Sequence, residues 1–414
     1  MPMDRRIIEA YLAEFKERRL PELVERSLKV EITKDAIISI IGPRRTGKTY
    51  YLFQLISRFG KDESLYLNFE DPELYDITSR DIKEIVNIHK EVFGRRPRFL
   101  FFDEIQNIPE WDKAVRSLYE LKDFHIFLTG SSSKLLSKEI ATSLRGRTIS
   151  YTLLPFSFKR FLDIQKIGVE GPVSFSKEAT IKNMLRQYIS HGGFPQVVLN
   201  PRKEYVERFL KEYLDLVMYR DVIERYKIKN LHVIRLMVNS LLASYSKEFS
   251  IHRFYRTLKS QNVVVSKKTL YNYFAYFEDA LLIFPLRKHS HSRKSSYASM
   301  PKIYLVDASL ALGRDSDERG RKIENLVALE LIRRRSYLEP LTEICYYKSP
   351  SGREVDFVIT DRSGVRQLIQ VCHDIEDVRT KERELEGLIT ASRKLECRDL
   401  LVITWDYEAL EDYK

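Results

Sequence analysis

The chain has 414 residues, of which 43% are hydrophobic and 31% are charged, and its formal net charge is +11. This composition excludes a chain dominated by flexible segments and predicts roughly two to four compact domains of about 100–200 residues each. The positive charge favours a polyanionic partner such as nucleic acid or an anionic membrane surface, although a soluble protein with a lysine-rich surface has the same balance.

The few cysteines and the lack of long apolar segments indicate in which cellular compartment the protein is expected. The cysteines stand at Cys345, Cys372 and Cys397, without the CxxC spacing of zinc or redox sites, and their low, odd number favours a reducing environment. The first residues lack the apolar core of a signal peptide. No apolar run reaches the roughly 18 residues of a membrane-spanning helix. We therefore expect a cytoplasmic protein with no membrane partner.

The first part of the chain alternates helical patterns with short apolar strands. Helices are expected at 4–30, 49–59, 80–93 and 111–121, and strands at 36–41, 64–69, 98–102 and 125–129. This alternation predicts a parallel sheet with helical crossovers. Because the strands are almost continuously apolar, helices should cover both faces of the sheet.

The pattern changes after about residue 155. Residues 156–230 are predicted to be helical almost throughout, residues 231–285 to form three helices, and the basic segment 287–300 to be an exposed loop or wing. A mixed pattern follows. It predicts strands at 302–306, 343–348, 354–360, 367–372 and 399–404, and helices at 321–335 and 379–394.

One segment carries a complete phosphate-binding motif, Gly42-Pro43-Arg44-Arg45-Thr46-Gly47-Lys48-Thr49. It follows an apolar strand and opens a helix, as G-x-x-x-x-G-K-[ST] requires. The glycines let the backbone wrap the phosphates, and the amides at the helix N-terminus face them. Lys48 should reach the β- and γ-phosphates and Thr49 should bind Mg²⁺. The segment predicts a site for ATP and Mg²⁺ in which all eight residues take part.

The strand before Asp103-Glu104 should complete this site. Parallel sheets bind ligands at the carboxyl ends of their strands, where these two acids are expected. We predict that Asp103 holds the metal, directly or through water, and that Glu104 acts as the general base for the attacking water. An apolar strand ending in Asp-Glu is common by itself and becomes informative because it follows a P-loop.

Two later segments offer further candidates. Thr129 and Ser131 end the next strand, where their hydroxyls would sense the γ-phosphate or orient the water, and a plain turn is the alternative. Arg145 and Arg147 are candidates for an arginine presented across a subunit interface to stabilise transition-state charge. Solvated surface arginines are the alternative for this pair.

These residues resemble the archaeal and bacterial AAA+ ATPases that carry a C-terminal domain labelled DUF4143. The similar segments are the P-loop, Leu67–Asp71, Phe102–Gln106, Leu128–Ser133 and Leu144–Arg147. The resemblance implies a three-layer ATPase core with a helical lid and assembly into rings or smaller homo-oligomers. The stretch Gly192–Pro195 resembles the lid of this family, which implies that Gly193 and Pro195 pack near the adenine. A turn between helices is the alternative.

The segment 250–285 is predicted to be a winged helix. Ser266 should cap its second helix, and Lys267 and Lys268 lie in the first turn, where a recognition helix meets the major groove. A wing should follow and contribute phosphate contacts from Arg287, Lys288, Arg293 and Lys294. A solvated hairpin tip explains the same cations, and winged helices also dock proteins.

The C-terminal part resembles the PD-(D/E)xK nuclease core. Glu324, Asp356 and Gln370 match the acids and the Glu/Gln position of that core, which bind Mg²⁺ in the active enzymes. Cys372 stands where the catalytic lysine is expected, and a neutral thiol cannot supply its charge. We therefore expect a vestigial nuclease site that does not cut DNA. A domain that binds DNA without cutting and a structural α/β cap both remain open.

The sequence as a whole predicts an α/β chain. The predicted parts are an AAA+ P-loop parallel-sheet core at 1–160, a helical lid at 161–230, a winged helix at 231–300 and a restriction-endonuclease-like α/β domain at 301–414. The predicted function is Mg²⁺-dependent ATP hydrolysis by a DNA-binding protein, with branched DNA as one candidate target. A protein-docking or signalling ATPase and a metal-dependent nuclease under ATP control are the alternatives.

Overall fold

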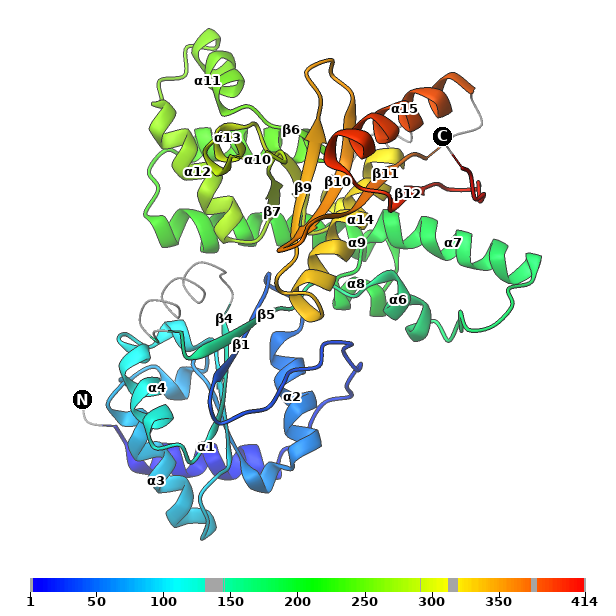
Figure 1. Ribbon diagram of the computed structural model, residues 1–414. Coiled ribbons are helices and arrows are strands. Elements are labelled where there is room, and N and C mark those ends of the chain that lie inside the picture. Colours follow the sequence, from blue (N-terminus) through cyan, green and yellow to red (C-terminus); the bar gives the residue numbers. More distant parts are fainter. Residues whose placement is uncertain are drawn as a thin grey trace. The chain divides into compact units, whose positions relative to one another are not determined.

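The computed structural model describes residues 3–130, 144, 146–290, 292–311, 319–373 and 378–412 (Figure 1). The chain divides into two compact units, Met1–Phe156 and Ser157–Lys414. The division lies close to the predicted end of the ATPase core at residue 160. The segments predicted as lid, winged helix and C-terminal domain all fall within the second unit.

The first unit is built on a parallel sheet. Its strands are β1 (Ile37–Ile41), β2 (Ser64–Asn68), β3 (Phe99–Asp103), β4 (His125–Gly130) and β5 (Thr148–Thr152), in the order β2-β3-β4-β1-β5. Every neighbouring pair is parallel, which confirms the predicted topology. The carboxyl ends of the strands therefore meet at one edge. The sequence did not reveal β5, because this edge strand is polar and partly exposed and lacks the apolar run of the others.

Helices cover both faces of this sheet. They are α1 (Arg5–Glu17), α2 (Lys48–Phe59), α3 (Asp81–Phe93) and α4 (Trp111–Glu120), with short 3₁₀ turns at Lys61–Glu63, Pro72–Leu74 and Ile105–Asn107. Buried residues of α1, α3 and α4 form one core with alternate residues of the strands. The helix α2 contacts β3 and β4, and its Phe53 packs 5.2 Å from the Tyr66 ring on β2. Residues of β1 and β3 are consequently buried on both faces, as expected.

The predicted helix over 4–30 is too long. The helix α1 ends at Glu17, and residues 18–36 form neither helix nor strand. Pro21 explains part of this difference, because a proline disfavours helical backbone in the residue before it. Beyond it the chain lies against α2, where the Tyr51 hydroxyl donates to the Leu28 carbonyl at 3.1 Å.

The second unit begins with helices. These are α6 (Phe158–Ile164), α7 (Phe175–His191), α8 (Pro195–Leu199), α9 (Lys203–Leu216), a π-helical continuation (Val217–Glu224) and α10 (Leu231–Ala243). The helical prediction for 156–230 is confirmed apart from the connections between these helices. Buried residues of α8, α9 and α10 share one core with the segment 249–311, so this part of the second unit folds around a single centre.

A small antiparallel sheet completes this core. Its strands β6 (Lys247–Glu248), β7 (Ile283–Leu286) and β8 (Lys302–Leu305) lie in the order β6-β8-β7, beside α11 (Ile251–Ser260) and α12 (Lys267–Asp279). The predicted cap is confirmed, because the Ser266 hydroxyl accepts from the Thr269 amide at 3.0 Å. The two helices of the predicted winged helix are present as α11 and α12, without a strand between them, and the winged helix itself stays a prediction.

The expectation of an exposed loop or wing at 287–300 holds only in part, because Ser292, Lys294 and Tyr297 are exposed whereas residues 287–290 are partly buried. The Tyr346 amide donates to the Arg287 carbonyl at 3.1 Å, and the His289 amide donates to the Tyr346 carbonyl at 2.7 Å. The chain then forms α13 (Arg293–Ala298). The basic composition of this segment predicted exposure, but composition carries no information about a backbone pairing with a strand far along the chain.

A mixed sheet forms the last part of the second unit. Its strands are β9 (Glu343–Lys348), β10 (Glu354–Asp361), β11 (Gly364–Val371) and β12 (Leu400–Ile403), in the order β12-β11-β10-β9. The first three are antiparallel, and β12 runs parallel to β11 after the crossover helix α15 (Val378–Leu395). The helix α14 (Arg319–Tyr337) packs against β8, β9 and β11. These elements confirm the strands and helices predicted after residue 302.

A glycine turn joins α7 to α8 and is fixed by a buried carboxylate. Gly192 has a φ of +89°, and a Cβ there would lie 2.6 Å from both carboxylate oxygens of Asp307. The Gly193 amide donates to Asp307 Oδ2 at 2.7 Å. Asp307 also accepts from the amide and the hydroxyl of Ser309, at 3.0 and 2.8 Å. The turn therefore requires glycine both for its φ and for the space that Asp307 occupies.

We predict that Gly192→Ala destabilises the second unit by about 3 kcal/mol, because left-handed strain and a clash with Asp307 add together. Gly171 is the matched control, since it has a φ of +75° but a Cβ added there would meet no atom within 4 Å. Gly171→Ala should cost only about 1 kcal/mol. Urea unfolding followed by Trp405 fluorescence in a Trp111→Phe background measures both, and equal costs would contradict the role of Asp307.

Candidate functional site

The P-loop connects β1 to α2 and holds its own lysine. Lys48 Nζ donates to the carbonyls of Gly42 and Pro43, both at 3.1 Å, and the Thr46 hydroxyl donates to the Pro43 carbonyl at 2.8 Å. A Cβ on Gly42 would lie 2.4 Å from the Leu153 carbonyl oxygen, so only glycine fits there. The loop thus places a buried ammonium group at the N-terminus of a helix, where phosphates bind.

An arginine far from the motif supports the loop. The Arg26 guanidinium is buried, donates to the carbonyl of Thr46 and to that of Leu154 at 3.3 Å, and lies 4.2 Å from the centre of the Phe156 ring. No signal in the sequence marked Arg26, because it falls in the segment that was predicted to be helical. Its position in an irregular segment between α1 and β1 becomes visible only in the folded chain.

The acidic strand end lies beside the P-loop. The Thr49 hydroxyl donates to Asp103 Oδ2 at 2.7 Å, and the Tyr66 hydroxyl donates to the same oxygen at 2.9 Å. The Thr129 hydroxyl donates to Asp103 Oδ1. Asp103 is 1% exposed. Three hydroxyl groups therefore fix the carboxylate, and two of them, from Thr49 and Thr129, were among the predicted site residues.

The electrostatics of this edge favour a bound cation. Burial, and then the charge of Glu104, raise the pKa of Asp103. Burial and the same neighbour raise the pKa of Glu70, whose carboxylate lies 3.8 Å from Arg44 Nη1. Ionised carboxylates are thus costly here unless a positive charge approaches. Mg²⁺ prefers one or two protein oxygens together with phosphate oxygens, and the pair Thr49 and Asp103 fits that requirement.

Glu104 is held in an unusual conformation above the P-loop. Its φ is +51°, and its amide donates to Thr129 Oγ1 at 3.0 Å. Gln106 Nε2 donates to Glu104 Oε2 at 2.5 Å, and Oε1 lies 3.8 Å from Lys48 Nζ. Left-handed backbone in a residue other than glycine costs energy and is frequent at functional sites. Gln106 and Tyr66 position the two acids, and no feature of the sequence marked either residue for this task.

Thr129 lies where the sequence predicted it but has a defined hydrogen-bonding state. Its hydroxyl donates to Asp103 and accepts from the Glu104 amide, so it orients both acids. Because its only proton is used by Asp103, it does not donate to a phosphate in this arrangement. Ser131 lies outside the residues that the structure describes, and so does Arg145.

Arg147 lies at the amino ends of the strands, whereas the P-loop lies at their carboxyl ends. Its carbonyl accepts from the amide of Ile37, the first residue of β1, at 2.8 Å, whereas the P-loop follows the last residue of that strand. Arg147 Nη1 lies 2.7 Å from Glu120 Oε1, and its guanidinium lies near the Tyr119 ring. Within one chain, the full length of β1 therefore separates Arg147 from the P-loop.

The predicted lid and DNA-binding residues belong to the second unit. The Gly193 amide is engaged by Asp307, and Pro195 begins α8; the proposed contact of both residues with adenine stays a prediction. Lys267, Lys268 and Lys294 are exposed. Arg287 and Lys288 are partly buried beside Tyr346. The side chain of Arg293 lies outside the part of the chain that the structure describes.

Glu324, Asp356 and Gln370, the residues of the predicted vestigial nuclease site, lie near one another and beside a lysine. The Asp356 amide donates to Gln370 Oε1 at 3.2 Å. Lys302 Nζ lies 2.8 Å from Glu324 Oε1 and 2.9 Å from Asp356 Oδ1. In the sequence, Lys302 is marked only as the start of a strand. Among the described residues, no group of three or more His, Cys, Asp or Glu side chains is arranged to hold a metal ion.

Comparisons with known proteins agree with this organisation. A family model described as an AAA domain matches residues 34–162, and two domains of unknown function, DUF8612 and DUF4143, match residues 182–316 and 319–412. The label DUF4143 therefore covers the last sheet and its helices, and the predicted winged helix lies in the preceding region. None of the helices in the described ranges has the length and apolarity needed to cross a bilayer.

The relatives cover most of the chain. An uncharacterized protein of Methanocaldococcus jannaschii is 39% identical over 393 residues, which are 94% of this chain and 87% of the relative. An uncharacterized protein of Haemophilus influenzae is 29% identical over 335 residues, covering 78% and 79%. A solved structure of AMPPCP-bound DnaA from Aquifex aeolicus aligns with 14% identity and a TM-score of 0.25, over 66% of this chain and 86% of that chain, which is too weak to carry an argument. The chain belongs to the family of AAA-domain proteins that carry a C-terminal DUF4143 domain.

Proposed function

We propose that the first unit hydrolyses ATP with Mg²⁺ and that the second unit binds DNA. One observation carries the first part of this proposal: the Thr49 hydroxyl donates to Asp103 at 2.7 Å while Lys48 lies 3.8 Å from Glu104. The P-loop and the acidic strand end are thus already assembled as one site. The function of such a site is to bind the phosphates of a nucleotide and to activate water against the terminal one.

Each residue at this edge has a distinct task in hydrolysis. Lys48 binds the β- and γ-phosphates after leaving the Gly42 and Pro43 carbonyls. Thr49 and Asp103 hold Mg²⁺, which supplies positive charge to the phosphate oxygens when bound. Glu104 accepts a proton from the attacking water, and Gln106 and the Thr129 hydroxyl fix its orientation.

Glu104→Gln should lower the ATP hydrolysis rate by about 100-fold or more while ATP binding is retained, because a general base contributes about 10²–10⁴-fold. Lys48→Ala should abolish ATP binding itself. Glu84→Gln, an exposed glutamate on α3, is the matched control and should leave both unchanged. Steady-state phosphate release and binding of a fluorescent ATP analogue separate the two effects. Normal hydrolysis by Glu104→Gln would remove the base from the proposal.

We further propose that this ATPase acts as a homo-oligomer, and the position of Arg147 supports this. Arg147 lies at the edge of the sheet opposite the P-loop, so it can reach the γ-phosphate only in another copy of the chain. Arg145 lies in the same segment and shares this role. An arginine in that position stabilises transition-state charge and typically contributes about 10³–10⁵ in rate.

Mixing two inactive variants tests this arrangement. Arg147→Ala keeps an intact P-loop but lacks the arginine, and Glu104→Gln keeps the arginine but lacks the base. A mixture should hydrolyse ATP about tenfold or more faster than either variant alone, since a mixed assembly combines one intact site with one intact arginine. Arg116→Ala, a partly exposed arginine on α4, replaces Arg147→Ala in the control mixture. Failure of the first mixture to gain activity would contradict a contribution between subunits.

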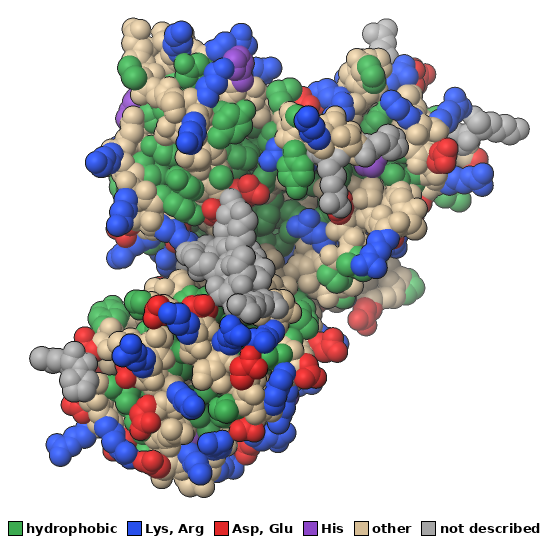
Figure 2. All heavy atoms as spheres, turned by 60° about the vertical axis from the view of Figure 1, so that its left-hand side comes forward, with side chains coloured by type: hydrophobic (Ala, Val, Ile, Leu, Met, Phe, Trp, Pro, Cys, Tyr) green, Lys and Arg blue, Asp and Glu red, His purple; other side chains and the backbone are tan. Residues whose placement is uncertain are grey.

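The DNA-binding part of the proposal is supported by one basic face, formed by the exposed residues of α11 and α12. Figure 2 shows Lys and Arg side chains over this part of the second unit. No acidic residue occurs between 251 and 277. The exposed members of the basic face are His252, Arg253, Arg256, Lys259, Lys267 and Lys268. A face with one sign of charge binds a polyanion by releasing its counterions.

Lys267→Ala/Lys268→Ala should weaken binding to duplex DNA about tenfold or more at moderate salt. It should also reduce the slope of log K against log[salt] by about 2, as expected for two lost phosphate contacts. The matched control is Lys203→Ala/Lys211→Ala, which removes the same charge from exposed positions of α9. Fluorescence anisotropy with linear and four-way DNA measures both quantities. Equal effects of the two double variants would show that only net charge matters.

Coupling between the two units is tested by the ATPase rate in the presence of single-stranded, duplex and four-way DNA. We expect stimulation by at least one of them, and we expect the stimulation to be lost in the Lys267/Lys268 double variant. An ATPase that neither binds DNA at low salt nor responds to it would instead support a protein-docking role for the second unit.

A further inference from the structure

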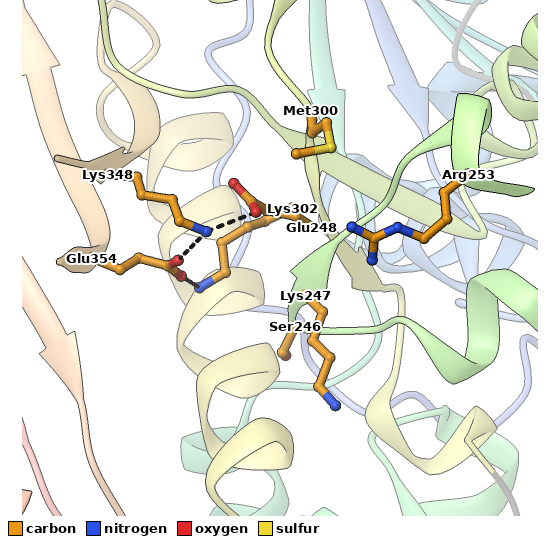
Figure 3. Close-up of a pocket in the computed structure, with 8 residues that line it drawn as sticks. All are labelled: Ser246, Lys247, Glu248, Arg253, Met300, Lys302, Lys348 and Glu354. Carbon is orange, nitrogen blue, oxygen red and sulfur yellow. Dashed lines mark hydrogen bonds and ion pairs between the residues drawn. The ribbon is translucent and has the colours of Figure 1, made fainter. Parts of the chain in front are cut away.

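A lysine occupies the centre of the predicted nuclease site. Lys302 comes from β8, and its Nζ lies 2.8 Å from Glu324, 2.7 Å from Glu354 and 2.9 Å from Asp356. An ammonium group has three N–H donors, and three carboxylates accept them. The side chain of Lys302 is 3% exposed, and those of Glu324 and Asp356 are 11% and 7% exposed. Figure 3 shows Lys302 reaching Glu354 beside Lys348 and Glu248.

The residues that match the nuclease pattern are each held by further hydrogen bonds. Asp356 is fixed from the other side by the Val371 amide, which donates to its Oδ2 at 2.9 Å. Gln370 accepts from the Asp356 amide and donates to Glu384 Oε2 at 2.7 Å. The Tyr304 hydroxyl donates to Glu324 Oε1 at 2.7 Å. The fold has therefore gathered the residues that match the nuclease pattern, and these residues are rigidly held.

We propose that the ammonium group of Lys302 permanently occupies the position of a divalent metal ion in this site, so that the domain binds no metal and cuts no nucleic acid. A Mg²⁺ ion lies about 2.0–2.1 Å from its carboxylate oxygens. An ion bound to the same oxygens of Glu324 and Asp356 on the side of Lys302 would overlap with Nζ, which lies 2.8 and 2.9 Å from them. The residues present do not fit a metal, because their acceptor capacity toward the centre is already used.

The charges explain why the lysine stays in place. Burial alone lowers the pKa of a lysine, but Tyr304 and the surrounding carboxylates hold the pKa of Lys302 well above its usual range. Burial, and then the charge of Asp356, raise the pKa of Glu324, and the ammonium group of Lys302 opposes this shift. Without the ammonium group, three carboxyl groups would face one another in a buried site. Breaking a buried ion pair in this way is strongly destabilising.

The same cluster joins the two sheets of the second unit. Lys302 lies on β8 of the antiparallel sheet, while Glu354 and Asp356 lie on β10 of the mixed sheet. Next to it, Lys348 of β9 lies 2.8 Å from Glu248 of β6 and 3.4 Å from Glu354. The Tyr346 hydroxyl also donates to Glu248 at 3.0 Å. Residues that match a catalytic pattern thus connect the antiparallel sheet, which lies beside α11 and α12, to the mixed sheet.

The test compares the native lysine with Lys302→Ala and Lys302→Met in the full chain. An Asp103→Asn background removes the metal ligand of the nucleotide site, and Trp405 fluorescence in the Trp111→Phe background reports on the second unit. In EDTA both variants should unfold on the order of 10 °C below the parent. Added MnCl₂ should restore stability to Lys302→Ala, which leaves room for the ion, and should affect neither the parent nor the Met variant.

Several outcomes would overturn the proposal. Mn²⁺ binding to the parent chain, detected by electron paramagnetic resonance, would show that the lysine does not exclude metal. Cleavage of DNA by the native protein with Mn²⁺, lost in Asp356→Ala, would show an active nuclease. The absence of destabilisation in Lys302→Met would contradict the charge argument, and the absence of Mn²⁺ rescue in Lys302→Ala would contradict the claim that the lysine replaces an ion.

A measurement on the native lysine covers the case in which the variants do not fold. Acylation of amines followed by peptide mass spectrometry should modify exposed Lys247 at least about tenfold faster than Lys302, since the latter is buried and protonated. MnCl₂ should not change the ratio. Rapid acylation of Lys302, or acylation that increases with MnCl₂, would mean that the ammonium group is displaceable and would refute permanent occupancy.

Discussion

All strand pairs of the first sheet are parallel, and this single constraint decides where the chemistry of the first unit lies. The P-loop follows β1, Asp103 ends β3 and Thr129 lies near the end of β4, so all three arrive at one edge. The hydrogen bonds from Thr49 and Thr129 to Asp103 follow from that register. The same register places Arg147 at the other edge, which separates the arginine from the site in its own chain.

The second unit depends on a different interaction, the burial of one ammonium group among three carboxylates. In water such a cluster would contribute little, because exposed ion pairs are worth about 0–1 kcal/mol. In a buried site each partner needs the others, since an uncompensated charge there is costly. Lys302 therefore connects β8 to β10 and α14, and these buried ion pairs contribute more to stability than the same pairs would on the surface. The basic face on α11 and α12 is positioned through this connection.

The two units differ in the groups that stabilise their buried carboxylates. At the edge of the first sheet, Asp103 and Glu104 are held by neutral hydroxyl and amide groups, and the raised pKa of Asp103 leaves the site ready for a cation. In the second unit the cation is part of the chain. A nucleotide site must exchange its ions and ligands, whereas a structural centre must not. This contrast supports the proposal that hydrolysis belongs to the first unit alone.

Local signals in the sequence were strong in the first unit and in the last sheet. Periodicity located β1 to β4, α2 to α4 and the elements of the last sheet to within a few residues, because apolar runs act over a few neighbouring positions. The expected helix after Glu17 was wrong, and the expected exposed loop or wing at 287–300 was right only in part. In both cases the decisive contact comes from far along the chain, with α2 in the first case and with Tyr346 of β9 in the second. No local pattern carries such information.

The sequence by itself determined the nucleotide motif, the parallel sheet and the family resemblance. It also identified Glu324, Asp356 and Gln370 as a set that the fold brings together. These features depend on short sequence segments in which the spacing of the residues follows from the geometry of a strand, a loop and a helix. The tertiary structure alone decided that Tyr66, Gln106 and Arg26 support the site and that Lys302 lies among carboxylates of β10 and α14. A side chain that reaches a site from another strand has no fixed spacing from it, and only the folded packing reveals it.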